Sequence, residues 1–206
     1  MEPDLDLIRQ AASVIISGGV VAYPTETFYG LGASALDRKA LAKIFEIKHR
    51  PAAKPLIVLV ASTEHLKDLV ACIPPGAVSL MKHLWPGPAT LLFPARPGLP
   101  VELCGNTGRI GIRISSHPWA GLLVREAGFP ITATSANMSG HPPPDTAEKV
   151  AAQLHSPAPD FILDGGSTPG GLPSTIVDLC TDPVSIVRPG AVSPEDIAAL
   201  CGKGHA

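Results

Sequence analysis

Three cations stand where a helix is expected to end and a buried strand to begin. Lys48, Arg50 and Lys54 fall within the stretch IFEIKHRPAAKPLIVLV, residues 44–60. At an exposed helix C-terminus, Lys48 and Arg50 would each stabilise the helix dipole by ~0.3–1 kcal/mol. That role does not account for Lys54, which follows Pro51 and precedes an apolar run. We therefore expect an anionic ligand to meet these side chains, because a charged group beside a buried strand needs a partner.

Two arginines in apolar segments raise the same question. Arg113 occurs in RIGIRIS and Arg188 ends VSIVR, and both segments are typical of strands. An arginine among apolar neighbours requires a partner for its guanidinium. That partner is either an anionic ligand or a structural aspartate, with Asp164 and Asp178 as the candidates. The residues alone leave both possibilities open.

Three polar loops adjoin predicted strands. YPTETFYGLG includes Thr27, TSANMSG covers residues 134–140, and GGSTPGGLPST covers residues 165–175. Open sheets bind ligands at loops that follow the carboxyl ends of strands. Each loop could instead be an ordinary polar turn, and the glycine-rich loop lacks the GxxxxGK[ST] spacing of a phosphate-binding loop.

The composition is that of a globular protein with a single domain, residues 1–206. A content of 45% hydrophobic residues and a formal net charge of −2 exclude a disordered or polybasic chain, so any contact with nucleic acid must come from a local patch. The four cysteines form no CxxC pair, and the start, MEPDLDLIRQ, is acidic rather than signal-like. No apolar run approaches the ~20 residues of a membrane helix. These features predict a cytoplasmic protein with no membrane segment.

Hydrophobic periodicity predicts helices that alternate with strands. Asp37 is expected to cap one helix and Pro51 to end it, while Asp145 and Glu148 form a capping-box pattern for another. Because some neighbouring strands are joined without a helix, the sheet should be mixed. Helices are expected at 5–15, 37–48, 64–71, 77–84, 119–128, 145–154 and from 193 onward, and strands at 20–23, 56–60, 89–95, 109–115, 130–134, 160–164, 174–179 and 184–188.

Seven motifs, taken together, resemble one family. They are YPTETFYGLG, KHRPAAKPL, WPGPATLLF, IGIRIS, TSANMSG, STIVDL and IVRPGA, in that order along the chain. The chain resembles the YrdC-like family of threonylcarbamoyl-AMP synthases, whose signature joins a KxR element, here Lys48 and Arg50, to an SxN element, here Ser135 and Asn137. The combination is far more specific than either element alone.

The resemblance implies an enzyme that joins L-threonine, bicarbonate and ATP into threonylcarbamoyl-adenylate and pyrophosphate, for threonylcarbamoyladenosine modification of tRNA. Mg²⁺ would arrive with ATP, and no dedicated metal site in the protein is expected. Proteins that transfer the threonylcarbamoyl group to tRNA would be partners downstream. Charge on the triphosphate would be stabilised by fixed cations, which would account for Lys48, Arg50 and Lys54.

The resemblance also implies roles for individual residues. Lys48 and Arg50 would be catalytic, and Thr27, Arg113 and Ser174 would bind threonine. The general base for the threonine amine has no assigned residue, and Leu59 stands where many relatives have histidine. The nucleotide side would consist of Arg50, Lys54, Ser135, Asn137 and Arg188.

The implied fold is a three-layer α/β structure of the α+β type, with a twisted mixed sheet flanked by helices and a concave cationic cleft. The chain resembles the short, single-domain form of the family. It lacks the zinc-finger cysteines of the related carbamoyl-transfer enzymes of hydrogenase maturation. The alternative is a non-catalytic protein of the same fold that binds double-stranded RNA or tRNA through its cationic face.

Overall fold

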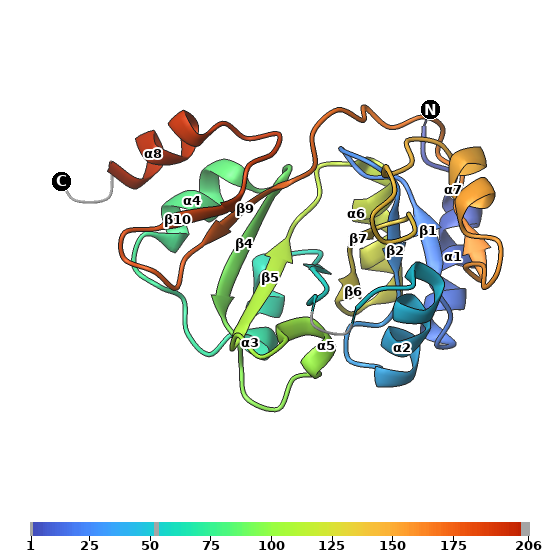
Figure 1. The fold of residues 1–206 in the computed structure, drawn as a ribbon, viewed down its shortest axis with the longest axis horizontal. Coiled ribbons are helices and arrows are strands. Elements are labelled where there is room, and N and C mark those ends of the chain that lie inside the picture. Colours follow the sequence, from blue (N-terminus) through green and yellow to red (C-terminus); the bar gives the residue numbers. More distant parts are fainter. Residues whose placement is uncertain (1, 52–53, 203–206) are drawn as a thin grey trace.

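Two mixed sheets form the centre of the molecule. The structure, a computed structural model, describes residues 2–51 and 54–202. A four-stranded sheet has the order β7-β2-β1-β8, and a six-stranded sheet has the order β10-β9-β4-β5-β3-β6 (Figure 1). The predicted mixed α/β class is confirmed, but the expected single sheet is wrong, because the described strands divide between two sheets.

The strands pair in both directions. In the smaller sheet β1 is antiparallel to β2 and parallel to β8, and in the larger sheet β4 is antiparallel to β5 and parallel to β9. The strands are β1 (Val21–Tyr23), β2 (Gly30–Gly32), β3 (Val58–Leu59), β4 (Ala89–Pro94), β5 (Arg109–Arg113), β6 (Ile131–Thr132), β7 (Thr134–Ser135), β8 (Phe161–Ile162), β9 (Thr175–Asp178) and β10 (Ser185–Arg188).

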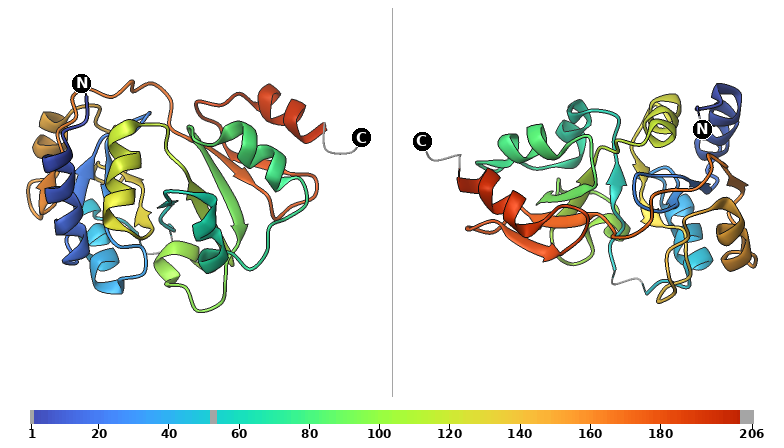
Figure 2. Two further views of the ribbon diagram at one scale, coloured as in Figure 1. Left: turned by 180° about the vertical axis from the view of Figure 1, so that it is seen from behind. Right: turned by 90° about the horizontal axis from the view of Figure 1, so that it is seen from above.

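Helices cover both faces of this arrangement. In Figure 2, α1, α6 and α4 lie along one side of the sheets, and α2 and α7 lie on the opposite side. The helices are α1 (Leu5–Ile16), α2 (Arg38–Lys48), the 3-10 helix η1 (Thr63–His65), α3 (Leu66–Leu69), α4 (Ala77–Leu84), α5 (Val101–Cys104), α6 (Pro118–Ala127), α7 (Ala147–Gln153) and α8 (Pro194–Gly202). No helix in the described ranges is both long and apolar enough to cross a membrane.

The helix α2 delivers the KxR element to the centre of the molecule. The Asp37 side chain accepts hydrogen bonds from the backbone N–H groups of Lys39 and Ala40, so the predicted cap is confirmed. The helix ends at Lys48, and His49 adopts the left-handed conformation with φ 46° and ψ 46°. The expectation that Pro51 ends the helix is wrong, because His49 has already turned the chain.

Two further local expectations are wrong. The helix α7 is capped by Thr146, whose side chain accepts from the Lys149 backbone, whereas Asp145 forms an ion pair with the Lys149 ammonium. The segment Gly30–Gly32 was expected to be loop and forms strand β2. A Cβ on Gly32 would lie 2.8 Å from Tyr23 Cε1, so glycine here allows the Tyr23 ring to pack across the neighbouring strand.

Candidate active site

A pocket of about 260 Å³ lies where residues of both sheets meet. The smaller sheet supplies the loop between β1 and β2 together with β7, and the larger sheet supplies the ends of β5 and β10 and the segment before β9. Its lining residues are Thr25, Thr27, Phe28, Tyr29, Gly30, Arg50, Pro55, Ile57, Arg113, Ala133, Thr134, Ser135, Pro143, Pro173, Ser174 and Arg188.

Three arginines, Arg50, Arg113 and Arg188, line this pocket. Burial lowers the pKa of Arg188, and the charges of Arg113 and Arg50 lower it further. Burial also lowers the pKa of Arg50. Arginine nevertheless stays protonated in proteins, so the pocket concentrates positive charge and is suited to an anionic ligand.

Arg188 is held against Ser174. Its Nη2 donates to the Ser174 carbonyl oxygen at 2.7 Å and to Ser174 Oγ at 3.0 Å, and its Nε donates to the same carbonyl at 3.2 Å. The backbone of Gly190 lies close against the segment that carries Ser174. A Cβ at this position would lie 2.2 Å from the Pro173 carbonyl oxygen, so only glycine fits here. No acidic partner is recorded for Arg188 in the described ranges. The alternative of an ion pair with Asp164 or Asp178 is therefore wrong for Arg188.

Arg113 has a different acidic partner from those expected. It is 5% exposed, and its Nη1 lies 3.7 Å from Glu26 Oε1, while its buried Nε has no hydrogen-bond partner among the described residues. Glu26 is held in turn by a hydrogen bond from Ser115 Oγ. Asp178, one of the expected partners, pairs instead with Arg109 at 2.5 Å. The guanidinium of Arg113 thus retains donors for a ligand.

Lys48 does not line the pocket but joins the KxR and SxN elements. It is 1% exposed, and its Nζ donates to the backbone oxygens of Ser135 and Asn137 and to Asn137 Oδ1. Its own carbonyl accepts from the Ser139 backbone at 2.9 Å. Burial, followed by the charge of Arg50, lowers the pKa of Lys48 to about 7. All three of the oxygens that Lys48 Nζ contacts belong to the loop that carries the SxN element.

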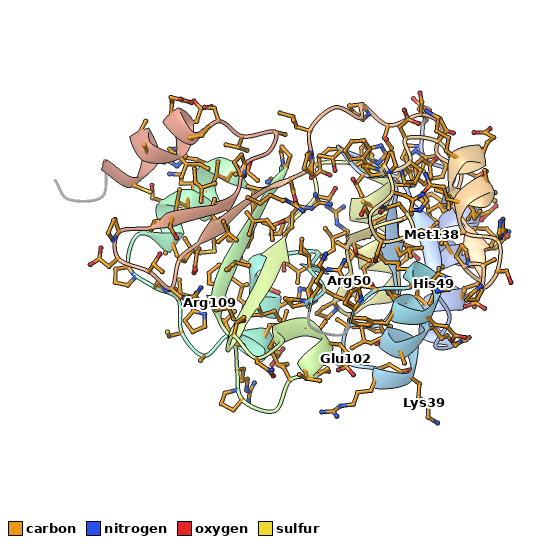
Figure 3. All side chains as sticks on the ribbon, in the orientation of Figure 1. Lys39, His49, Arg50, Glu102, Arg109 and Met138 are labelled. Carbon is orange, nitrogen blue, oxygen red and sulfur yellow. The ribbon has the colours of Figure 1, made fainter. Side chains whose placement is uncertain are left out.

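The other two cations of the opening motif differ in position. Arg50 lies between the two sheets in Figure 3, and it donates to the backbone oxygens of Lys54 at 3.1 Å and Pro55 at 3.0 Å. These bonds hold its guanidinium beside the pocket that it lines. Lys54 is exposed and is not among the lining residues, so water can solvate its charge.

Hydroxyl groups line the side of the pocket that follows β1. Thr25 Oγ1 donates to the Phe28 carbonyl at 2.6 Å, accepts from the Thr27 backbone and lies 3.2 Å from Thr27 Oγ1. Tyr29 Oη donates to the Gly166 carbonyl at 2.7 Å. These bonds fix the loop after β1 against the glycine-rich segment.

The structure brings together most of the residues singled out in the sequence. Thr27, Arg50, Arg113, Ser135, Ser174 and Arg188 line the pocket, whereas Lys48, Lys54 and Asn137 do not. Leu59 is fully buried in the apolar core beside Arg113 on the neighbouring strand, and it does not line the pocket.

Sequence reasoning missed the apolar part of the lining. It consists of Phe28, Pro55, Ile57, Ala133, Pro143 and Pro173. Apolar residues carry no chemical signature. Four of these six could have been indicated only because they adjoin Thr27, Lys54, Thr134 and Ser174 in the sequence, and Ile57 and Pro143 had no such signal.

The chain matches known proteins over most of its length. The family model for Sua5, YciO and YrdC proteins, described as telomere recombination, matches residues 13–190. The threonylcarbamoyl-AMP synthase of Bacillus subtilis is 43% identical over 199 residues, covering 96% of this chain and 57% of that protein. The protein of the same name from Methylobacillus flagellatus is 38% identical over 173 residues, covering 84% of this chain and 94% of that protein.

A solved structure shares the fold closely. The crystal structure of P. abyssi Sua5 complexed with L-threonine has a TM-score of 0.94 and 42% identity, covering 98% of this chain and 59% of that chain. This chain thus spans little more than half the length of the Bacillus subtilis and P. abyssi relatives. The resemblance seen in the motifs is confirmed by sequence and by fold, and the chain belongs to the Sua5/YciO/YrdC family.

Proposed function

We propose that this chain is an L-threonylcarbamoyladenylate synthase. The observation that carries the proposal is a small pocket in which three arginines face serine and threonine hydroxyls. Such a set of donors suits a ligand with a carboxylate and phosphates. The names of the relatives, and the L-threonine bound in the P. abyssi structure, support the same reaction.

The proposed reaction requires charge stabilisation more than a protein nucleophile. The neutral threonine amine adds to the carbon of bicarbonate, one amine proton and the bicarbonate hydroxyl leave together as water, and a carbamate remains. A carbamate oxygen then attacks the α-phosphorus of ATP, and the bond to the leaving pyrophosphate breaks. ATP enters as its Mg²⁺ complex, which neutralises part of the charge that develops on the phosphates.

The threonine side of the site consists of Thr27, Arg113 and Ser174. Arg113 lines the pocket and would bind the carboxylate, since guanidinium donors match carboxylate oxygens. Thr27 and Ser174 add hydroxyl groups from opposite sheets. Ile57 and Ala133 provide apolar surface in the same pocket, which suits a side chain with a methyl group.

The nucleotide side consists of Arg50, Lys54, Ser135, Asn137 and Arg188. Arg50 and Arg188 supply positive charge at the pocket, and Ser135 supplies a hydroxyl. Lys54 is exposed near the Arg50 side chain and can reach phosphates that extend out of the pocket. Lys48 and Asn137 act by holding the loop that carries Ser135, so we assign Lys48 a positioning role rather than direct contact with the triphosphate.

The proposal is tested by incubating the 206-residue chain with ATP, Mg²⁺, bicarbonate and L-threonine. We expect pyrophosphate and threonylcarbamoyl-adenylate only in the complete mixture. Omitting threonine or bicarbonate should abolish pyrophosphate, and serine should support a lower rate, because one methyl group gives only ~1–3 kcal/mol of discrimination. Pyrophosphate that forms without bicarbonate would overturn this reaction.

A double-stranded RNA-binding protein without catalytic activity would produce no pyrophosphate in any mixture. In the cell, the product would pass to proteins that transfer the threonylcarbamoyl group to tRNA.

A further inference from the structure

A buried hydroxyl that the proposed reaction does not use lies directly behind Ser174. Thr90 is on strand β4, is 0% exposed and does not line the pocket. Its Oγ1 lies 3.1 Å from Ser174 Oγ, and no other hydrogen-bond partner of this hydroxyl is recorded in the described part of the chain. Ser174 itself lines the pocket. The Thr90 hydroxyl is therefore joined to the pocket lining by its hydrogen bond with Ser174 Oγ.

The Ser174 hydroxyl also meets Arg188. Arg188 Nη2 lies 3.0 Å from Ser174 Oγ and can only donate, because a guanidinium has no acceptor. One lone pair of Ser174 Oγ is therefore occupied. Accepting a hydrogen bond from a charged donor also makes the serine hydroxyl a stronger donor itself.

The remaining protons have two possible arrangements. If Ser174 donated to Thr90, the Thr90 proton would be left without an acceptor inside the core, which is unfavourable for a buried donor. If Thr90 donates to Ser174, both lone pairs of Ser174 Oγ are occupied and no buried proton is left unpaired. The Ser174 proton is then free to point into the pocket, where a ligand or water accepts it.

We propose that Thr90 is a positioning residue that fixes the direction of the Ser174 hydroxyl, so that Ser174 donates its proton to an acceptor oxygen of the bound ligand. The inference rests on the proposed function in taking L-threonine as that ligand. Thr90 adds no charge and makes no contact with the ligand. It acts only by excluding the orientation in which the serine proton points away from the pocket.

The test uses Thr90→Val, which removes the hydroxyl with little change in volume. Calorimetric titration of the full chain with L-threonine should show affinity about threefold to tenfold below wild type, the ratio expected when a neutral hydrogen bond loses its preferred direction. Thr90→Ser keeps the hydroxyl and should restore affinity close to wild type. In the synthase assay, KM for threonine should rise while kcat changes little.

Two further variants separate this role from a structural one. Thr132 is also 0% exposed, and its hydroxyl bonds to the backbone of Leu31 and Ala33 outside the pocket lining. Thr132→Val should bind L-threonine as wild type does, even if it lowers thermal stability. Adding Thr90→Val to Ser174→Ala should cause no further loss of affinity, because Thr90 acts only through the serine hydroxyl.

The outcomes are distinct. Unchanged affinity in Thr90→Val, equal loss in Thr132→Val, or a full additional loss in the Ser174→Ala background would each overturn the role of Thr90. A wild-type chain that binds no L-threonine would overturn the proposed substrate, and with it the ligand assigned to this hydroxyl. Wild-type binding together with unchanged binding in Thr90→Val would overturn the role of Thr90 alone.

Discussion

Lys48 holds Asn137 by two contacts of the same ammonium group. Lys48 Nζ lies 2.7 Å from the Asn137 backbone oxygen and 3.3 Å from its Oδ1. Asn137 Oδ1 also accepts from Ser135 Oγ at 2.5 Å, so the lysine, the asparagine and the serine form one network. The KxR and SxN elements are therefore joined by direct contact, although 84 residues lie between Arg50, the end of one, and Ser135, the start of the other.

The burial of Lys48 makes the free energy of unfolding depend on pH. The pKa of Lys48 falls from 10.5 to about 7 in the folded chain, chiefly through burial. Between these values the unfolded chain binds a proton that the folded chain has released, so stability rises with pH. We expect the free energy of unfolding of wild type, relative to Lys48→Met, to increase from pH 7 to about pH 10, by at most ~1.4 kcal/mol per pH unit.

Denaturant unfolding at a series of pH values measures this difference. Lys43→Met is the matched control, since Lys43 is a partly exposed lysine of the same helix. A difference for Lys48→Met that stays constant over this range would show that the three oxygens keep Lys48 protonated.

Arg50→Ala should reduce catalytic efficiency about 100-fold or more, the loss typical of one preorganised donor to developing charge. Its effect on thermal stability should be small, because among the described residues the hydrogen bonds of this side chain go to the backbone oxygens of two exposed residues, Lys54 and Pro55. Arg50→Lys keeps the charge but loses the planar donors, so we expect an intermediate rate. Steady-state kinetics measure the catalytic efficiency of each variant, and thermal melts measure its stability. Near-normal turnover in Arg50→Ala would contradict the proposed role of Arg50 in stabilising charge.

Arg113→Ala should weaken L-threonine binding about tenfold to a hundredfold and leave binding of a non-hydrolysable ATP analogue nearly unchanged. The reason is that Arg113 lines the pocket, while Glu26 lies near its Nη1 at 3.7 Å. Calorimetry with each ligand separately measures both affinities. Asp178→Asn, which breaks the Arg109 pair, controls for loss of an ion pair to a buried carboxylate and should alter neither affinity.

Arg188→Ala should lower the affinity for both L-threonine and the nucleotide, rather than for the nucleotide alone. Its guanidinium holds the carbonyl and the hydroxyl of Ser174, a residue assigned to threonine, while lining the pocket itself. Separate titrations with L-threonine and the ATP analogue should show losses within about threefold of each other, because one side chain serves both sides. Loss confined to the nucleotide would mean that Ser174 keeps its position without Arg188.

The sequence predicts the regular elements well where local signals agree. In α2, the Asp37 cap and the apolar periodicity specify the helix together. Strand β2 was missed because glycine has low strand propensity, and its pairing depends on Tyr23 packing over Gly32. The division into two sheets depends on which distant strands pair, which periodicity does not specify.

The site was predictable in residue types but not in side-chain direction. Arg113 and Arg188 were recognisable because arginines in apolar strands need partners. The actual partner of Arg113 is Glu26, in a loop far away in the sequence, and that of Arg188 is Ser174, 14 residues earlier in the segment before β9. Lys48 and Lys54 look equivalent as charges. One is buried in a hydrogen-bond network and the other is exposed, and the turn at His49 lies between them along the chain.

The parallel pairings described above also bear on how the chain reaches its native state. Val21 pairs with Phe161 and Ala89 pairs with Thr175, so both sheets that build the pocket close long loops. Loop closure costs entropy before the pairing compensates for it, and such non-local contacts form slowly. We therefore expect the pocket to be completed late in folding, and a ligand that occupies it to stabilise only the fully assembled chain. Ligand binding can therefore serve as a measure of complete folding, which helix content alone does not provide.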